Sequence, residues 1–354
     1  MKRFVCLLST LLLALSLTPA LAAEPAEQQA LPALPVQTEQ PAIYTGRLNA
    51  GVELYAQPSR DSQVVGNLAQ RFGIEILEVL PDWVLIRGEG KTGYIQRRYV
   101  NDTKVAPVDP STAPRYPAMP PAYLGWVAQE TGVRVAADAN AEALITLQQG
   151  ARLAIHGFED GWAKVIYHRQ FAYVDTRHLS EVQPVQPIAQ NADTQSPIAA
   201  FTSFYRITTD GNNVSRMQNL VVACERMART SIPPGGRFDF NGDIGPYNAR
   251  SGYLPAIVLV DGGTALGYGG GTCQVSSTLF NNLMQLPGLE ITARRPHGPR
   301  GATYLPLHSD AAVGNSSLNL VFINHYDFPI RIDGHAQDGA LTIAIYRADD
   351  AIGS

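Results

Sequence analysis

The chain has 354 residues, of which 27 are Lys or Arg and 31 are Asp or Glu, so its formal net charge at pH 7 is −4. This balance argues against nucleic acid or an anionic membrane surface as the main partner, because both attract strongly basic proteins. The length suits two or three domains, and the 25 prolines and 31 glycines predict many turns and linkers.

The chain starts with the features of a secretory signal peptide. Lys2 and Arg3 precede an apolar run, which ends in the small-residue pattern ALA at 20–22. The run is shorter than the roughly 20 residues that a membrane-spanning helix needs. We therefore predict a signal peptide over residues 1–22 and an exported protein of the periplasm or cell wall, without an integral membrane span.

Segments rich in proline and small polar residues divide the rest of the chain. Such segments are extended and lack core-forming residues, so we predict linkers over 23–42, 104–121 and 182–199. The predicted domains between and after them are 43–103, 122–181 and 200–350.

The first two of these domains repeat each other. Runs such as IEILEV and RLAIHG alternate apolar and polar residues, as expected of short strands in a small β-barrel. The matched pairs are Gly51 with Gly132, Trp83 with Trp162, and Tyr94 with Tyr173. In this order of features both domains resemble the bacterial SH3 domain. Because many members of that family bind cell-wall peptides or glycans, the resemblance implies peptidoglycan stem peptides and glycan as partners.

Aromatic residues of the repeats can serve a core or a ligand groove. We predict that Trp83 and Trp162 lie in the barrel cores, and that Tyr55, Tyr94 or Tyr99 line any groove. The histidines of these two domains lack the spacing of metal ligands, and no metal or organic cofactor is expected anywhere in the chain.

The last domain is predicted to be α+β. Apolar residues recur at helical spacing around Cys224 and again from Val275 to Leu286, and runs such as ALTIAIYRA are typical of strands. Signal cleavage would remove Cys6 and leave Cys224 and Cys273, which an oxidising compartment could join. We predict that both stay free, because Cys224 lies on the apolar face of its helix.

Residues 267–283 read GYGGGTCQVSSTLFNNL, with three glycines, a cysteine and then a helix-like pattern. Glycines let the backbone approach a ligand closely, and the N–H groups of Gly270 and Gly271 could converge on an oxyanion. With Thr272 as a candidate N-cap, Cys273 lies in the first helical turn, where the helix dipole favours the thiolate. The pattern predicts a nucleophilic cysteine, with a glycine-rich structural turn as the alternative.

A thiol nucleophile usually needs a base. His297, in a Pro-His-Gly turn, is the first candidate and His308 is its rival, while Asp310 could orient either imidazole. Neighbouring arginines could hold a substrate carboxylate in a bidentate manner. The predicted oxyanion and substrate-binding residues are Gly270, Gly271, Gln274, Ser276, Arg294, Arg295 and Arg216.

The motifs PPGGRFDFN, GGGTCQVSSTLFN and GLEITARRPHGP, with others between residues 203 and 347, resemble the VanW domain. Some proteins with this domain are described as L,D-transpeptidases that cross-link peptidoglycan through a cysteine. The resemblance implies that Cys273 is the nucleophile and His297 its base. The sequence departs from the usual pattern at two positions: Arg295 replaces a histidine, and Thr272 replaces an aliphatic residue.

Together these features predict a multidomain fold, with two small all-β SH3-like barrels followed by an α+β VanW-like domain. We expect an exported L,D-transpeptidase-like enzyme that cross-links peptidoglycan stem peptides through a thioacyl intermediate on Cys273. A peptidoglycan cysteine peptidase and a non-catalytic peptidoglycan-binding or assembly protein are the alternatives.

Overall fold

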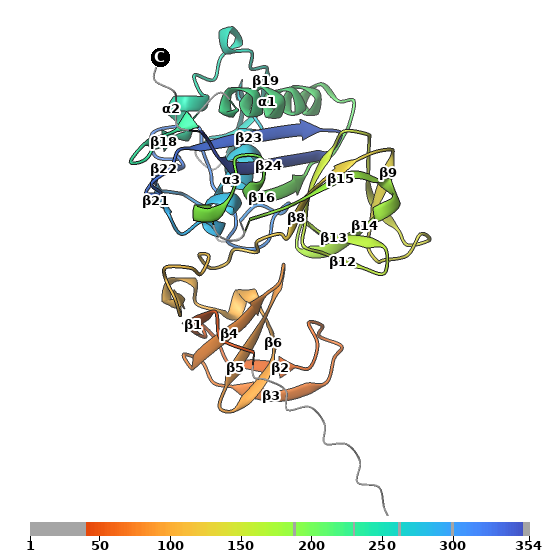
Figure 1. The fold of residues 1–354 in the computed structure, drawn as a ribbon, viewed down its shortest axis with the longest axis vertical. Helices are drawn as coiled ribbons and strands as arrows, with labels where there is room; N and C mark the ends of the chain where they lie inside the picture. Colours follow the sequence, from red (N-terminus) through yellow and green to blue (C-terminus); the bar gives the residue numbers. More distant parts are fainter. Residues whose placement is uncertain (1–39, 187–188, 229–230, 261–262, 299–300, 350–354) are drawn as a thin grey trace, which may run out of the picture. The chain divides into compact units, whose positions relative to one another are not determined.

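The computed structural model describes residues 40–186, 189–228, 231–260, 263–298 and 301–349. The predicted signal peptide, Cys6 and most of the first predicted linker lie outside these residues. The described part is mostly β, with several sheets and few helices (Figure 1). None of its helices is both long enough and apolar enough to cross a membrane.

The first β-unit forms one antiparallel sheet in the order β3-β2-β6-β5-β4-β1-β7. Its strands are β1 (Tyr44–Arg47), β2 (Val52–Tyr55), β3 (Val64–Leu68), β4 (Gly73–Val79), β5 (Trp83–Gly88), β6 (Lys91–Gln96) and β7 (Ala106–Pro107). In β5 the alternate residues Val84 and Ile86 are fully buried. Since neighbours in a strand point to opposite faces, Trp83 is only half-buried, so the prediction of Trp83 as barrel core is wrong.

The second β-unit has two antiparallel sheets, in the orders β10-β9-β14-β13-β12 and β11-β8-β15. Its strands are β8 (Tyr123–Val127), β9 (Thr131–Arg134), β10 (Ala143–Leu147), β11 (Arg152–Ile155), β12 (Gly157–Glu159), β13 (Trp162–Tyr167), β14 (Gln170–Asp175) and β15 (Leu179–Pro184). Trp162 is half-buried for the same reason as Trp83, because Ala163 and Val165 take the inner face of β13.

The last domain combines a four-stranded sheet, β16-β24-β23-β17, with a three-stranded sheet, β18-β22-β21, and the hairpin β19-β20. Its strands are β16 (Pro197–Phe204), β17 (Ser231–Ile232), β18 (Arg237–Asp239), β19 (Pro255–Val260), β20 (Gly263–Tyr268), β21 (Leu289–Ala293), β22 (Val321–Asn324), β23 (Ile330–Gln337) and β24 (Ala340–Arg347). The helices are α1 (Gly211–Met227), α2 (Phe240–Ile244) and α3 (Thr272–Gln285). Helix α1 packs on β23, and α3 packs on β16 and β24 (Figure 1).

The second β-unit and the last domain share apolar cores. Phe204 of β16 and Ala340 of β24 lie in the same buried cluster as the second unit's strands. Polar bonds cross the same junction, since Ala154 N–H donates to Thr202 Oγ1 at 2.8 Å and Arg152 pairs with Asp333 at 2.6 Å. These contacts join the two parts into one packed body.

Parts of the predicted linkers are ordered structure. Strand β16 is buried along its whole length although its first residues fall in the predicted linker 182–199. In the segment 104–121, Arg115 donates to the carbonyls of Leu283, Leu286 and Pro287 at 2.9–3.2 Å. The last carbonyls of a helix lack partners within it, so Arg115 closes the C-terminal end of α3. The proline-rich composition of these segments predicted linkers, so neither the buried strand β16 nor the contacts of Arg115 was expected.

Candidate active site

Helix α3 begins directly after the glycine run. Its N-cap is Gly271, which has a left-handed backbone with φ of 108° and so suits a residue without Cβ. Thr272 is the first helical residue and not the cap; its hydroxyl donates to Gly269 O at 2.9 Å. Cys273 therefore lies in the first turn, as predicted, one position later than a cap at Thr272 would place it.

Gly270 packs against the hairpin that precedes the helix. A Cβ at this position would lie 2.7 Å from Ile257 O and 2.8 Å from the Ala256 Cβ, so a larger residue would push the turn away from β19. The Gly270 carbonyl is fixed on its other side by Asn219 Nδ2 at 2.9 Å. The glycine run thus has a packing role beside any contact with a substrate oxyanion.

The Cys273 thiol is partly buried and has backbone partners. Its Sγ lies 3.4 Å from Val313 O and accepts from Val313 N–H at 3.5 Å. Cys224, in contrast, is only 2% exposed, and burial raises the pKa of its thiol. Both cysteines are free, which confirms the prediction that they are not bridged.

His297 and Asp310 stand beside this thiol. Asp310 Oδ2 accepts from the His297 backbone N–H at 2.6 Å and lies 2.7 Å from His297 Nδ1. The other ring nitrogen, Nε2, has no contact with Asp310, and the Cys273 thiol lies close enough to the imidazole to raise its pKa. The structure brings the three side chains together in the order thiol, imidazole, carboxylate.

The proton positions in this trio follow from its contacts. The hydrogen bond to Asp310, the hydrogen bond to Cys273 and the charges of both raise the pKa of His297 to about 9, although burial opposes the shift. Burial favours the neutral form of Asp310, but the hydrogen bonds and charge of His297 and the charge of Arg294 lower its pKa. At neutral pH the imidazole is therefore a cation beside an ionised carboxylate.

Arg294 holds the carboxylate from the opposite side. Its Nε donates to Asp310 O at 2.8 Å and its Nη2 to His308 O at 3.2 Å, with Asp310 Oδ1 at 3.4 Å. The guanidinium also lies 4.7 Å from the Phe280 ring centre. Since these contacts occupy the guanidinium, we assign Arg294 to the support of Asp310 and not to the substrate carboxylate for which it was predicted.

The rival histidine lies elsewhere. His308 Nδ1 is 3.0 Å from Asp102 Oδ2 of the first β-unit. Asp310 therefore pairs with His297, and the geometry favours His297 over His308 as the partner of the thiol.

The other predicted substrate-binding residues fall into two groups. Gln274 and Ser276 are buried, with donors bonded to Ser203 Oγ, Phe204 O and Ala311 O. We assign these two residues to packing because their polar groups already have partners. Arg295 is exposed, and Arg216 lies half-buried beside Gly271, so both remain available to a substrate.

Three neighbours of the thiol were not predicted. Val313 supplies the backbone contacts to Sγ. Tyr304 and Tyr247 lie close enough to feel the charge of Cys273, and burial raises the pKa of both phenols. No local motif marks these positions, because they approach Cys273 only through the folding of distant segments. Within the described ranges, no three His, Cys, Asp or Glu side chains gather where they could hold a metal ion.

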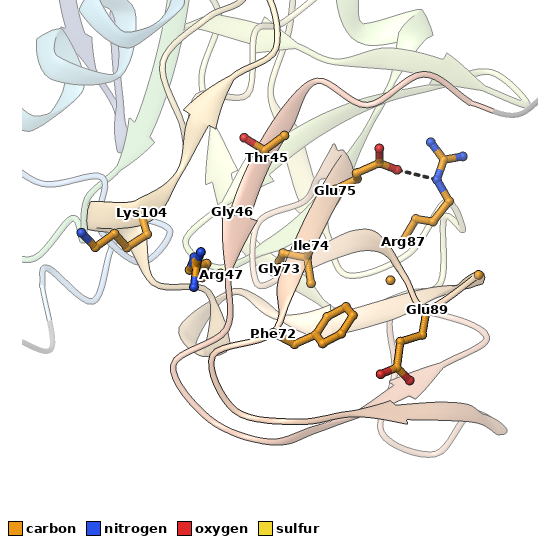
Figure 2. Close-up of a pocket in the computed structure, with 12 residues that line it drawn as sticks. Thr45, Gly46, Arg47, Phe72, Gly73, Ile74, Glu75, Arg87, Glu89 and Lys104 are labelled. Atoms are coloured by element: carbon orange, nitrogen blue, oxygen red, sulfur yellow. Dashed lines mark hydrogen bonds and ion pairs between the residues drawn. The ribbon is translucent and has the colours of Figure 1, made fainter.

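The first β-unit carries two hollows. One of about 390 Å³ is lined by Tyr55, Trp83 and Tyr99 among others, and the Tyr55 and Trp83 rings meet edge to face at 5.7 Å. Tyr55 and Tyr99 were predicted as groove residues and do line it, whereas Tyr94 is not among the lining residues. The other hollow, of about 650 Å³, has the ion pair between Arg87 and Glu75 in its wall (Figure 2). Neither hollow is lined by residues of the last domain.

Known proteins resemble parts of this chain. Residues 215–346 match the family model described as VanW like protein, and residues 50–101 match the bacterial SH3 domain. A 140-residue segment is 34% identical to the uncharacterized protein YoaR of Bacillus subtilis (strain 168), which corresponds to 40% of this chain and 46% of YoaR. The chain thus spans about half the length of this relative.

Solved structures give a weaker likeness. NlpC1 from Trichomonas vaginalis is 11% identical, with 88% of this chain and 95% of that chain covered and a TM-score of 0.17. NlpC2 from the same organism is 10% identical, with coverages of 53% and 58% and a TM-score of 0.16. At such TM-scores we draw nothing from the likeness about fold or activity.

The matched segments leave out the second β-unit, so its relation to the SH3 domain stays a prediction. The two matched domains point to a protein associated with the cell wall. Residues 215–346 therefore form a VanW-like domain, and residues 50–101 form a bacterial SH3 domain.

Proposed function

We propose that this protein is a cysteine-dependent acyltransferase that acts on peptidoglycan stem peptides in the manner of an L,D-transpeptidase. The observation that carries the proposal is the trio of Cys273, His297 and Asp310, with Asp310 bonded to His297 Nδ1 at 2.7 Å and the thiol close enough to the same ring to raise its pKa. A nucleophile beside a base that a third group orients is the arrangement required for acyl transfer.

In the first step the Cys273 thiolate attacks the carbonyl carbon of a stem-peptide amide. The protonated His297 gives its proton to the leaving amine as the C–N bond breaks, which leaves a thioester on Cys273 and a neutral imidazole. In the second step an amine of another stem attacks the thioester, His297 accepts its proton, and Cys273 leaves as the thiolate when the C–S bond breaks and the new amide bond forms. Asp310 keeps the imidazole in one tautomer and stabilises its cationic form.

The negative charge that develops on the substrate oxygen needs donors. The start of a helix leaves its first N–H groups without partners inside the helix, and Cys273 occupies that turn of α3. The proposed oxyanion donors are the N–H groups of Gly270, Gly271 and Cys273. Arg295 and Arg216 are the proposed contacts to the carboxylates of the stem.

The first β-unit supports the choice of substrate. Its groove presents Tyr55, Trp83 and Tyr99 with Arg98 close by, a surface on which a sugar ring or peptide can stack. A module that holds the enzyme on an insoluble wall raises the effective concentration of stem peptides near Cys273. The predicted export of the chain would place it with this substrate.

Mass spectrometry of the full chain after incubation with stem peptides tests the proposal. We expect a thioester adduct on Cys273 in wild type and in Cys224→Ala, and none in Cys273→Ala. With an amine acceptor present, a dimeric muropeptide is the expected product. A shortened monomer alone would identify a peptidase, in which water takes the acyl group. No adduct and no product from any stem peptide would favour a non-catalytic wall protein.

A further inference from the structure

The segment 301–310, which carries Asp310, is held by both β-units. Leu307 O accepts from Arg97 Nη2 of the first unit at 2.8 Å. Leu305 O accepts from Arg169 Nε of the second unit at 3.3 Å. Leu305 also packs in an apolar cluster with residues of the second unit, the segment between the units and β16. The VanW-like domain therefore does not hold this segment alone.

A second contact from the first unit follows one residue later. Asp102, in the short 3₁₀ helix Asp102–Lys104, pairs with His308 Nδ1 at 3.0 Å. The backbone of His308 is left-handed, with φ of 63°, a conformation that is uncommon for residues other than glycine. The contact between its ring and Asp102 ties the His308 side chain to the first β-unit.

The burial of Arg97 shows that its contact is specific. The side chain is only 1% exposed, and its guanidinium donates to Pro81 O at 3.1 Å as well as to Leu307 O. Each donor of a buried cation that lacks a partner costs free energy, and Nε of Arg97 already has none. Because one of those partners belongs to the segment 301–310, displacement of the segment would leave a buried donor unpaired.

The held residues connect directly to the candidate active site. Arg294 donates to His308 O at 3.2 Å and to Asp310 O at 2.8 Å, so it joins the held part of the segment to the carboxylate residue. Asp310 in turn accepts from His297, whose ring faces Cys273. A continuous series of contacts thus runs from the first β-unit to the thiol.

We propose that Arg97 and Asp102 of the first β-unit are positioning residues for the candidate active site. By holding Leu307 and His308 they fix the place of Asp310, and through Asp310 the orientation of the His297 ring. The inference rests on the proposed function in that it concerns the same trio, but it does not depend on the identity of the substrate. The SH3 domain is then a structural part of the site as well as a candidate wall-binding module.

The experiment measures the rate of Cys273 alkylation by iodoacetamide against pH, in the full chain on a Cys224→Ala background. The test variants are Arg97→Met and Asp102→Asn, and the matched control is Lys91→Met. Lys91 is an exposed cation of β6 in the same unit, and it is not among the residues that line either hollow. We expect both test variants to react about 2- to 30-fold more slowly at neutral pH, the range usual for residues along a coupled network. Their pH profiles should move toward that of His297→Ala, and the control should match the parent.

Thermal melting shows whether each variant is folded. If Arg97→Met does not fold, Asp102→Asn decides, since it keeps the size of the side chain. Parental rates and pH profiles in the folded test variants would overturn the inference while leaving the acyltransferase proposal intact. Altered profiles together with no adduct from any stem peptide would leave the inference standing and remove the proposed function.

Discussion

Cys224 and Cys273 lie in two helices of one domain, yet their surroundings are opposite. Cys224 lies in the last turn of α1 and is 2% exposed. Gly334 packs so closely against it that a Cβ at that position would lie 3.1 Å from the sulfur. Cys273 sits in the first turn of α3, partly buried, beside a protonated imidazole. Burial raises the pKa of the Cys224 thiol, whereas Cys273 lies at a helix start with the imidazolium of His297 beside it.

The comparison teaches that position along a helix and the neighbouring charges, and not the thiol itself, decide reactivity. Cys224 has the surroundings of a core residue, and Cys273 has those of a nucleophile. Four predictions test this difference between the two cysteines, in order of decreasing expected effect.

The largest effect is expected from exchange of the nucleophile. Cys273→Ala should lower acyl transfer by roughly 10⁴-fold or more, because loss of a nucleophile removes the whole covalent route. Cys224→Ala is the matched control and should keep nearly full activity. Product formation from stem peptides, followed by chromatography, measures both. Equal activity of the two variants would mean that Cys273 has no catalytic role.

The next effect concerns the orientation of the base. Asp310→Asn should lower acyl transfer by about 10²- to 10⁴-fold, because an amide can favour the wrong tautomer of His297. Because asparagine has the same size as aspartate, the melting temperature of Asp310→Asn should fall far less than its activity. Asp102→Asn serves as a milder comparison at the other carboxylate of this region. A fully active Asp310→Asn variant would exclude Asp310 from the trio.

The third change separates the two histidines. His297→Ala should slow the alkylation of Cys273 at pH 7 by about 10-fold or more and shift the reaction to higher pH, because the thiolate loses its cationic partner. His308→Ala should have a much smaller effect, since this ring faces Asp102. Cys224 should react only after unfolding. If His308→Ala produced the larger shift, the assignment of His297 would be wrong.

The smallest effect is a pH dependence of stability. The pKa of His297 is raised to about 9 in the folded protein, above its reference of about 6.5. Its stabilising contribution is therefore full below about pH 6.5 and is lost as the pH rises through about 9. Denaturant unfolding should show that wild type exceeds His297→Gln by roughly 2 kcal/mol at pH 6, with the gap closing by pH 10.

His156 provides the opposite control in the same experiment. Burial, helped by the charge of Lys164, lowers its pKa to about 4, so its contribution is present above about pH 6.5 and is lost as the pH falls toward 4. His156→Gln should therefore flatten the acid side of the stability profile, and His297→Gln the alkaline side. A gap for His297→Gln that did not depend on pH would argue against the ion pair with Asp310.

Local sequence patterns predicted much of the contrast between Cys224 and Cys273. The glycine run followed by a cysteine predicted a helix start at the thiol, and apolar spacing predicted that Cys224 is a core residue. The N-cap of α1 is Asp210, whose side chain accepts from Asn213 N–H, and the apolar spacing did not mark this residue. Choices among neighbouring cap residues depend on backbone geometry that a sequence pattern does not carry.

Contacts between distant segments could not be predicted in the same way. The pairing of Asp310 with His297, and of His308 with Asp102, depends on how the segment 301–310 folds over α3 and meets the first β-unit. From the sequence either histidine could have faced the thiol. Arg294 illustrates the same limit, because an arginine suited to a substrate carboxylate instead donates to the backbone around Asp310.

The shared core of the second β-unit and the VanW-like domain has a consequence for modularity. A cut or a recombination point between residues 185 and 197 would leave Phe204 and Ala340 without their apolar neighbours and Arg152 without Asp333. Such a cut would destabilise strands β16 and β24. Helix α3, which carries Cys273, packs on these two strands. The second β-unit is thus an inseparable part of the body that carries Cys273, and a minimal fragment that keeps this body intact has to begin before Tyr123.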